Sequence, residues 1–248
     1  MPCKDVERAL QALEGAALRT MNVFGAQQLA NTMHAMAKAN YIPTNPLVLE
    51  ALEQQAEALA DTFNAQGVAN TLWAYATMGR EPGAGVMRVL EGRAEVLAGT
   101  FNAQDVANTL WAACVLSILC APGKGRRWIN TIVQLLVSLG KPACWNSAQL
   151  CQVHQFFVCC SLEPRLRTEA INDTWALKET CREAFECTKA APSATHQQVS
   201  ETLRHMGLSV EDEVRCPSGC SIDMIVYDTN SQILKTQYPS TCTITKLN

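Results

Sequence analysis

A segment of twelve residues is written three times in this chain, at almost constant spacing. The copies occupy residues 24–35, 63–74 and 101–112, so their starts lie 39 and then 38 residues apart. A period of this length is typical of stacked-repeat architectures, in which each unit packs on the next. Such arrays present a long surface to an extended partner, whereas an enzyme gathers a few groups in one pocket.

Each copy predicts a pair of helices joined by a short turn. In the second copy, apolar residues at positions 48, 49, 52, 56 and 59 follow a helical spacing, which predicts a first helix over 45–61. Asn64 is a suitable N-cap for the second helix, because its side chain can accept an unpaired backbone N–H. Phe63 and Val68 flank this cap as a hydrophobic staple, and Gly79 fits the position after the helix.

The repeats divide the chain into three predicted parts. Residues 1–140 hold three clear copies and a degenerate one, and residues 141–190 form a helical extension that ends in a charged helix over 164–189. The third part covers residues 191–248. After a linker over 190–195 we expect, in chain order, a short helix over 197–206, a solvated acidic turn over 211–213, and two strands over 222–227 and 233–234 separated by a turn over 228–231. The predicted fold class is mainly α, an α-α superhelical solenoid followed by a small, truncated α/β domain.

The amino-acid composition argues against some classes of function. A hydrophobic content of 48% with 17% charged residues suits a globular chain, and a net charge of −3 argues against a uniformly basic nucleic-acid binder. Residues 63–140 nevertheless carry six basic and four acidic side chains, so we expect any polyanion contact there. Because no run of eighteen apolar residues occurs, we expect no membrane span.

The sequence offers no clear site for catalysis, a metal or a cofactor. Twelve cysteines include no C-x-x-C pair, and most lie in apolar helical stretches, which favours buried, reduced thiols. The four histidines, at positions 34, 154, 196 and 205, lie far apart in the sequence. Walker-type, H-E-x-x-H and G-x-S-x-G motifs are all missing. We therefore expect no catalytic residue, no metal site, no cofactor and no small-molecule substrate.

The second helix of each repeat carries a polar and aromatic stripe. At about 100° per residue, the side chains of this stripe point away from the apolar face, and the candidate RNA-binding positions in the three copies are Gln27, Asn31, His34 and Lys38, then Gln66, Asn70, Trp73 and Thr77, then Gln104, Asn108 and Trp111. Amides can read base edges and aromatic rings can stack on unpaired bases. The alternative is structural: an Asn identical in every copy satisfies groups between repeats, and the Trp rings fill the space there.

Basic residues of the middle region are candidate phosphate contacts. They are Arg93, on a predicted first helix, and the cluster Lys124, Arg126 and Arg127 in a predicted loop. Phosphate contacts of this kind make affinity depend on salt. The alternative is ordinary solvated charge.

The motif F-N-A-Q-x-V-A-N-T-L-W-A on a 38-residue helical repeat resembles the octotricopeptide repeats of algal and protist organellar gene-expression factors. Residues 198–207, 211–214 and 221–225 resemble the start of a RAP domain of FAST-kinase-like RNA proteins, and residues 148–155 resemble the helix that precedes that domain. The resemblance implies single-stranded RNA as a partner, with other organellar gene-expression proteins, in a mitochondrion or chloroplast. The roles it implies are RNA processing, transcript stability, ribosomal RNA maturation and translation activation.

The RAP resemblance also implies a restriction-endonuclease-like fold, with Asp223 at the acidic position of the first core strand. The E-x-D-G strand that usually follows is replaced by residues 233–239, so a metal would lack a ligand and we expect no nuclease activity. The first expectation is therefore a non-enzymatic RNA-binding factor, and the alternative is a protein-interaction scaffold without direct RNA binding. Because residues 6–13 already resemble a first repeat helix and no transit peptide precedes them, we expect the chain to begin inside an array.

Overall fold

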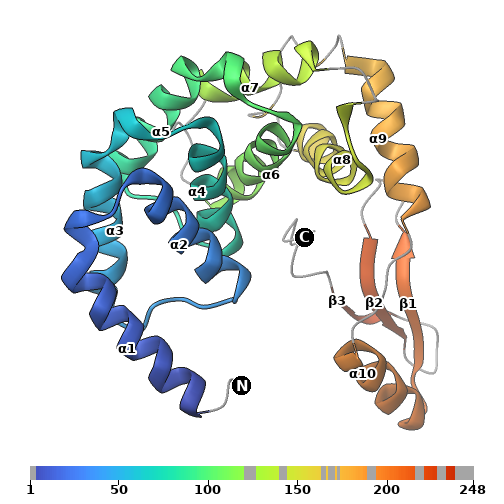
Figure 1. Cartoon of the computed structure of the whole chain (residues 1–248). Coiled ribbons are helices and arrows are strands. Elements are labelled where there is room, and N and C mark those ends of the chain that lie inside the picture. Colours follow the sequence, from blue (N-terminus) through green and yellow to red (C-terminus); the bar gives the residue numbers. More distant parts are fainter. Residues whose placement is uncertain are drawn as a thin grey trace.

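The computed structural model describes most of the chain, namely residues 4–119, 127–139, 144–162, 166, 171, 174–188, 194–215, 221–227 and 233–237. Within these ranges the chain is mainly helical, with one small sheet in its C-terminal part (Figure 1). The first eight helices are α1 (Lys4–Thr20), α2 (Ala26–Lys38), α3 (Pro46–Ala58), α4 (Ala65–Thr77), α5 (Ala84–Val96), α6 (Ala103–Leu119), α7 (Arg127–Ser138) and α8 (Ser147–Leu162).

These eight helices form two layers of an arc. Figure 1 shows α1, α3, α5 and α7 in an outer layer and α2, α4, α6 and α8 in an inner layer. A short 3₁₀ turn leads from the outer to the inner helix in the three clear repeats, at Met21–Val23, Ala60–Thr62 and Ala98–Thr100. In each of these segments the elements follow the order helix, short turn and helix.

The inner helix α4 starts at the cap that the sequence predicts, and α6 and α8 start in the same way. The Asn64 side chain accepts a hydrogen bond from the backbone N–H of Gly67 at 2.7 Å, and Asn102 and Asn146 cap α6 and α8 in the same way. Gly79 follows α4 with φ of 65°, a left-handed conformation that glycine adopts without strain. Asn40 takes the corresponding place after α2, with φ of 49°.

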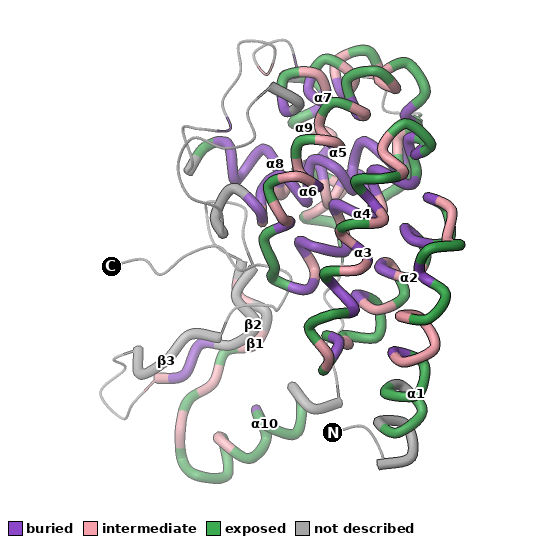
Figure 2. Tube along the Cα trace, turned by 90° about the vertical axis from the view of Figure 1, so that its left-hand side faces the viewer, coloured by how far each residue is buried: buried purple, intermediate pink, exposed green. Residues whose placement is uncertain are grey.

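Small residues bring the inner helices close together. Ala30, Ala69 and Ala107 occupy the same position in α2, α4 and α6, and all three are buried. A Cβ atom placed on Gly67 of α4 would lie 3.8 Å from the Cβ of Ala30. Buried residues concentrate along α4, α6 and α8 (Figure 2). The inner helices lie in closer contact with one another than the outer helices do, and the array curves around this inner layer (Figure 1).

The region after the array differs from the prediction in its details. α9 (Trp175–Cys187) packs on α8 and is shorter than the charged helix expected over 164–189. α10 (Ala194–His205) ends before Gly207, as predicted, and precedes an antiparallel sheet in the order β1 (Ser209–Arg215), β2 (Ser221–Tyr227) and β3 (Ile233–Gln237). The expected turn at 228–231 and most of the expected linker at 190–195 lie outside the described residues.

The acidic segment 211–213 is a strand, and the prediction of a solvated turn is wrong. β1 pairs with β2 along its length, with Glu211 opposite Ile225 and Asp212 opposite Met224. Asp212 is held from the neighbouring helix α10 by Ser200 and Arg204. Asp223 consequently lies on the second strand of this sheet, whereas the resemblance assigned it to the first strand.

We predict that Asn64→Ala destabilises the chain by about 1 kcal/mol, because the backbone N–H of Gly67 loses its acceptor. Denaturant unfolding followed by circular dichroism measures this change. The matched control is Gln54→Ala, an exposed side chain on α3, which should leave the unfolding midpoint unchanged. Equal midpoints for the two variants would show that this cap contributes nothing.

Candidate functional site

The candidate surface is the face of the inner layer that carries the predicted stripe. In α4, Val68, Leu72 and Ala76 are buried, as predicted for the apolar face. The stripe residues of α2 are exposed, except for the half-buried His34. Those of α4 range from the exposed Gln66 to the half-buried Asn70, Trp73 and Thr77. The structure therefore brings the stripes of α2 and α4 together on adjacent helices, with their amides accessible.

Aromatic rings of the stripe contact one another across three helices. The ring centroids of His34 and Trp73 lie 4.7 Å apart, and those of Trp73 and Trp111 lie 6.1 Å apart. Tilted rings at these separations are in contact, so they form a continuous aromatic seam between repeats. A base cannot insert between neighbouring rings of this seam, and only the exposed parts of His34 and Trp73 remain for stacking.

Two polar atoms near the seam are buried without a partner. In the described part of the chain, neither Nδ1 of His34 nor Oγ1 of Thr77 has a hydrogen bond. Burial, and then the positive charge of Lys38, lower the pKa of His34. The imidazole is therefore neutral near pH 7, and it can offer a hydrogen bond or a ring face but no positive charge.

The third stripe is used inside the protein. Asn108 and Trp111 of α6 are buried, with 7% and 8% of their surface exposed. The Asn108 Oδ1 atom accepts hydrogen bonds from Gln104 at 2.8 Å and from Gln152 of α8 at 3.2 Å. Gln149 of α8 donates to Gln104 Oε1 at 3.1 Å. At α6 the amides thus join two inner helices, and the exposed Gln104 is the stripe residue that still reaches solvent.

By contrast, the equivalent amides of α2 and α4 are not engaged. Within the described residues, the side chains of Asn31 and Asn70 make no hydrogen bond to the protein. Asn31 is exposed and Asn70 is half-buried. Three asparagines at one position of the repeat therefore differ in what they can offer to a ligand.

Of the predicted basic residues outside the stripe, Arg93 is the one whose side chain the structure describes, and it is used between repeats. Arg93 lies on the outer helix α5, where its Nε donates to the backbone oxygen of Phe63 at 2.8 Å. Gln55, one repeat earlier, donates to the oxygen of Phe24 at 2.9 Å, so this position joins consecutive repeats. Lys124 and Arg126 lie outside the described residues, and only the backbone of Arg127, the first residue of α7, lies within them.

Sequence reasoning missed a set of carboxylates that join the outer helices. The Glu14 carboxylate accepts hydrogen bonds from the backbone N–H groups of Thr44 and Asn45 at 2.7 and 3.2 Å, and from the Tyr41 hydroxyl. One repeat later, Glu53 accepts from Gly83 N–H at 3.3 Å. Each carboxylate therefore lies at the start of the next outer helix, where the helix dipole favours negative charge.

The signal for these carboxylates was present in the sequence. Glu14, Glu53 and Glu91 recur at the same spacing as the repeated motif. Burial acts to raise the pKa of Glu14, but the hydrogen bonds from Tyr41, Thr44 and Asn45 outweigh it and the pKa is lowered. Burial, together with Glu14, raises the pKa of Tyr41 to about 12, so its hydroxyl remains a donor.

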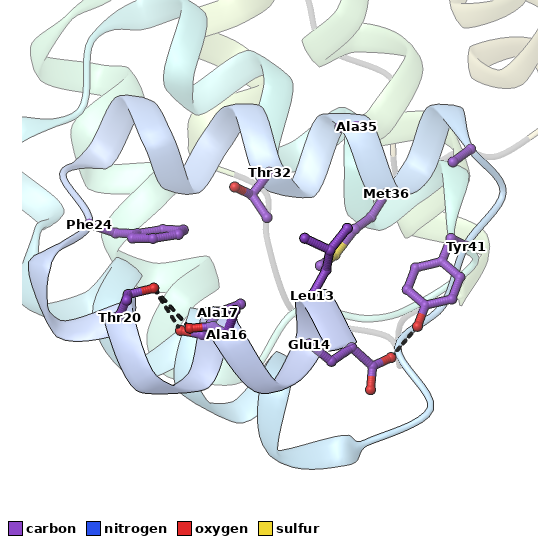
Figure 3. A pocket seen from close by; sticks show the side chains of 11 residues that line it. Leu13, Glu14, Ala16, Ala17, Thr20, Phe24, Thr32, Ala35, Met36 and Tyr41 are labelled. Carbon is purple, nitrogen blue, oxygen red and sulfur yellow. Dashed lines mark hydrogen bonds between the residues drawn. The ribbon is translucent and has the colours of Figure 1, made fainter. Parts of the chain in front are cut away.

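An apolar pocket of about 500 Å³ opens between α1 and α2. Figure 3 shows Leu13, Phe24, Thr32 and Met36 around it, with the Glu14–Tyr41 hydrogen bond at one edge. Its lining is almost entirely apolar. The pocket belongs to the first repeat and lies apart from the α4 part of the stripe.

Other classes of site find no support in the described ranges. No three side chains of His, Cys, Asp or Glu gather there as a metal site would require. Nor does any described helix combine the length and apolar character needed to span a bilayer. The cysteines of α6, α8 and α9 are mostly buried, as predicted, and burial raises the pKa of the Cys114 thiol and brings that of Cys181 to about 12.

Comparison with known proteins gives one family similarity. A family model described as a protein of unknown function, DUF1601, matches residues 7–33, 47–72 and 98–110, which together make up less than half of the chain. The first two segments each run from an outer into an inner helix, and the third reaches into α6, so the similarity falls on three successive repeats. No curated protein matches the chain.

We predict that Glu14→Gln lowers the unfolding free energy at pH 7 by about 1–2 kcal/mol, because charge-assisted hydrogen bonds are lost. The folded-state pKa of Glu14 is lowered, so its contribution is present above the unfolded value of 4.5 and disappears as pH falls through the folded value. Denaturant unfolding at pH 7 and between pH 5 and 3 should therefore show the two proteins converging in acid. Glu50→Gln, an exposed change on α3, is the control, and a constant difference across pH would contradict the assignment.

Proposed function

We propose that this chain is a non-enzymatic RNA-binding factor of the octotricopeptide type, which binds single-stranded RNA along the inner layer of an α-solenoid. The observation that carries the proposal is the placement of one repeated motif on adjacent inner helices, with the amides of Gln27, Asn31, Gln66 and Asn70 on the same accessible face. Amides supply both a donor and an acceptor, which is the chemistry that distinguishes base edges.

The binding surface is centred on α2 and α4. Asn31 and Asn70 make no hydrogen bond to the described part of the protein, so each can pair with a base without breaking an existing contact. Partly exposed rings of His34 and Trp73 offer stacking surface beside these amides. Asn108 and Trp111 on the next inner helix are buried, so we assign them internal contacts rather than base reading.

Phosphate contacts on this surface start with Lys38, which is exposed in the last turn of α2 at the end of the stripe. The sequence cluster Lys124, Arg126 and Arg127 remains the second candidate. Arg93 is not part of the proposed surface, because its Nε is bonded to the backbone of the preceding repeat.

The C-terminal part fits a RAP-like domain that lacks catalytic function. The order α10, β1, β2, β3 gives the helix and antiparallel strands of a small α/β unit. A second carboxylate after Asp223 is missing from the sequence of β3, Ile-Leu-Lys-Thr-Gln, so we assign this unit no nuclease activity. The sequence resemblance to organellar factors implies a role in RNA processing, transcript stability, ribosomal RNA maturation or translation activation in a mitochondrion or chloroplast, and we include that role in the proposal.

We predict that the double variant Gln66→Ala with Asn70→Ala weakens binding of short unstructured RNA about tenfold, which corresponds to 1.4 kcal/mol. Alanine favours helix, so α4 should stay folded. Fluorescence anisotropy titrations measure the dissociation constant, and circular dichroism confirms the fold. Gln54→Ala on the outer helix α3 is the matched control, because it removes an exposed amide from the other layer.

The same titrations, repeated over a range of salt concentrations, test how much of the RNA affinity comes from contacts with phosphates. Affinity should fall with salt by about 0.7 logarithmic units per phosphate contact for each tenfold rise in salt. Arg126→Ala with Arg127→Ala should reduce this slope, while the variant on α4 should leave it unchanged. Equal affinities for the α4 variant and its control, or a slope of zero, would contradict RNA binding at this face.

A protein-interaction scaffold is the second candidate. The net charge of −3 and the use of the third stripe inside the protein favour it. If RNA binding is the function, nuclease treatment should release co-purifying partners from the tagged protein. Partners that remain bound after complete RNA digestion, together with the absence of RNA affinity, would favour the scaffold.

A further inference from the structure

The end of the array formed by α1 and α2 presents an apolar face that has no neighbour among the described residues. Leu13 on α1 is 63% exposed, whereas its equivalents Leu52 on α3 and Leu90 on α5 are both 0% exposed. Ala35 on α2 is exposed, whereas its equivalent Ala74 on α4 is fully buried. The same positions are therefore open in the first repeat and closed in the second and third.

The pocket between α1 and α2 is the hollow part of this face. Seven of its lining positions follow the same rule, being exposed or half-buried in the first repeat and buried in the second, and in the first repeat they are Leu13, Ala17, Phe24, Thr32, Ala35, Met36 and Ala39. Their second-repeat equivalents are Leu52, Ala56, Phe63, Thr71, Ala74, Tyr75 and Met78. These positions are buried in the second repeat because the first repeat packs against them.

The helix α2 covers most of the corresponding face of the second repeat, because it packs along α4. Leu29, Ala30, Met33 and Ala37 of α2 are buried and recur at helical spacing. A Cβ atom placed on Gly67 would lie at an ordinary contact distance of 3.8 Å from the Cβ of Ala30, so small side chains fit in this interface. A helix with this pattern of small and apolar side chains is thus what the exposed face of α2 is shaped to receive.

We propose that the α1–α2 face is a docking site for one further helix pair of the same repeat type, seated in the register in which the first repeat lies on the second. A helix pair seated there continues the series of interfaces already present between α2 and α4 and between α4 and α6, whether or not the chain binds RNA. The occupant's inner helix fills the pocket over Ala35 and Met36, and its outer helix covers Leu13.

The test adds this occupant to the full chain. A copy of residues 45–82 is placed before Val6 in place of residues 1–5, which keeps the repeat spacing. We expect the extended protein to have a higher Tm and the amides of α1 to become slower in hydrogen exchange. Leu13→Glu should leave the Tm of the original chain almost unchanged but lower that of the extended chain by about 5 °C, since the side chain becomes buried there.

Leu47→Glu is the matched control. Leu47 is 55% exposed near the start of α3, and Arg8 occupies the equivalent position of the first repeat, so a charge is compatible with this site. The control should have the same small effect in both chains. Equal effects of Leu13→Glu in the two chains, or unchanged exchange in α1, would overturn the proposal. So would dimerisation of the original chain that Leu13→Glu abolishes, because it would assign the face to a second copy.

Discussion

Close packing of the inner helices through small residues is the constraint on which the rest of the structure depends. Alanine at positions 30, 69 and 107 is buried and lets α2, α4 and α6 approach one another, and these inner helices lie closer together than the outer helices do. The difference in spacing curves the array and places equivalent residues of successive repeats side by side. Both the aromatic seam and the accessible amides follow from that alignment, because each is made by one repeat position on neighbouring helices.

Much of the array could be predicted because its signals are local. Asn64 marks the start of α4 and Gly79 its end, and each acts on backbone groups only a few residues away. β1 could not be recognised in this way. Its acidic residues are unfavourable for a strand, and they are held by contacts from α10 and β2, namely Arg204 and Ser200 on Asp212 and Tyr227 on Glu211.

In the candidate site, residues at the same position of the repeat differ in burial, and the repeat sequence alone does not predict this difference. Asn70 and Asn108 lie in nearly identical segments, yet one is half-buried without a partner in the described structure and the other is buried between Gln104 and Gln152. The difference comes from α8, whose glutamines close over α6. A repeat motif specifies its own helix and the contact with the next one, but a neighbour that departs from the motif decides which copies remain accessible.

The carboxylates of Glu14 and Glu53 give the outer layer a role that the inner layer does not have. They tie the start of each outer helix to the helix before it, and they do so with charged groups that would be costly to bury without hydrogen bonds. Charge is thereby concentrated in the outer layer, where Arg93 also joins two repeats. The inner layer is left with neutral amides and rings, and His34 adds no charge because burial and Lys38 lower its pKa. A neutral, hydrogen-bonding inner face with Lys38 at its edge has the chemistry that the proposed RNA ligand requires, since bases are read by hydrogen bonds and phosphates by cations.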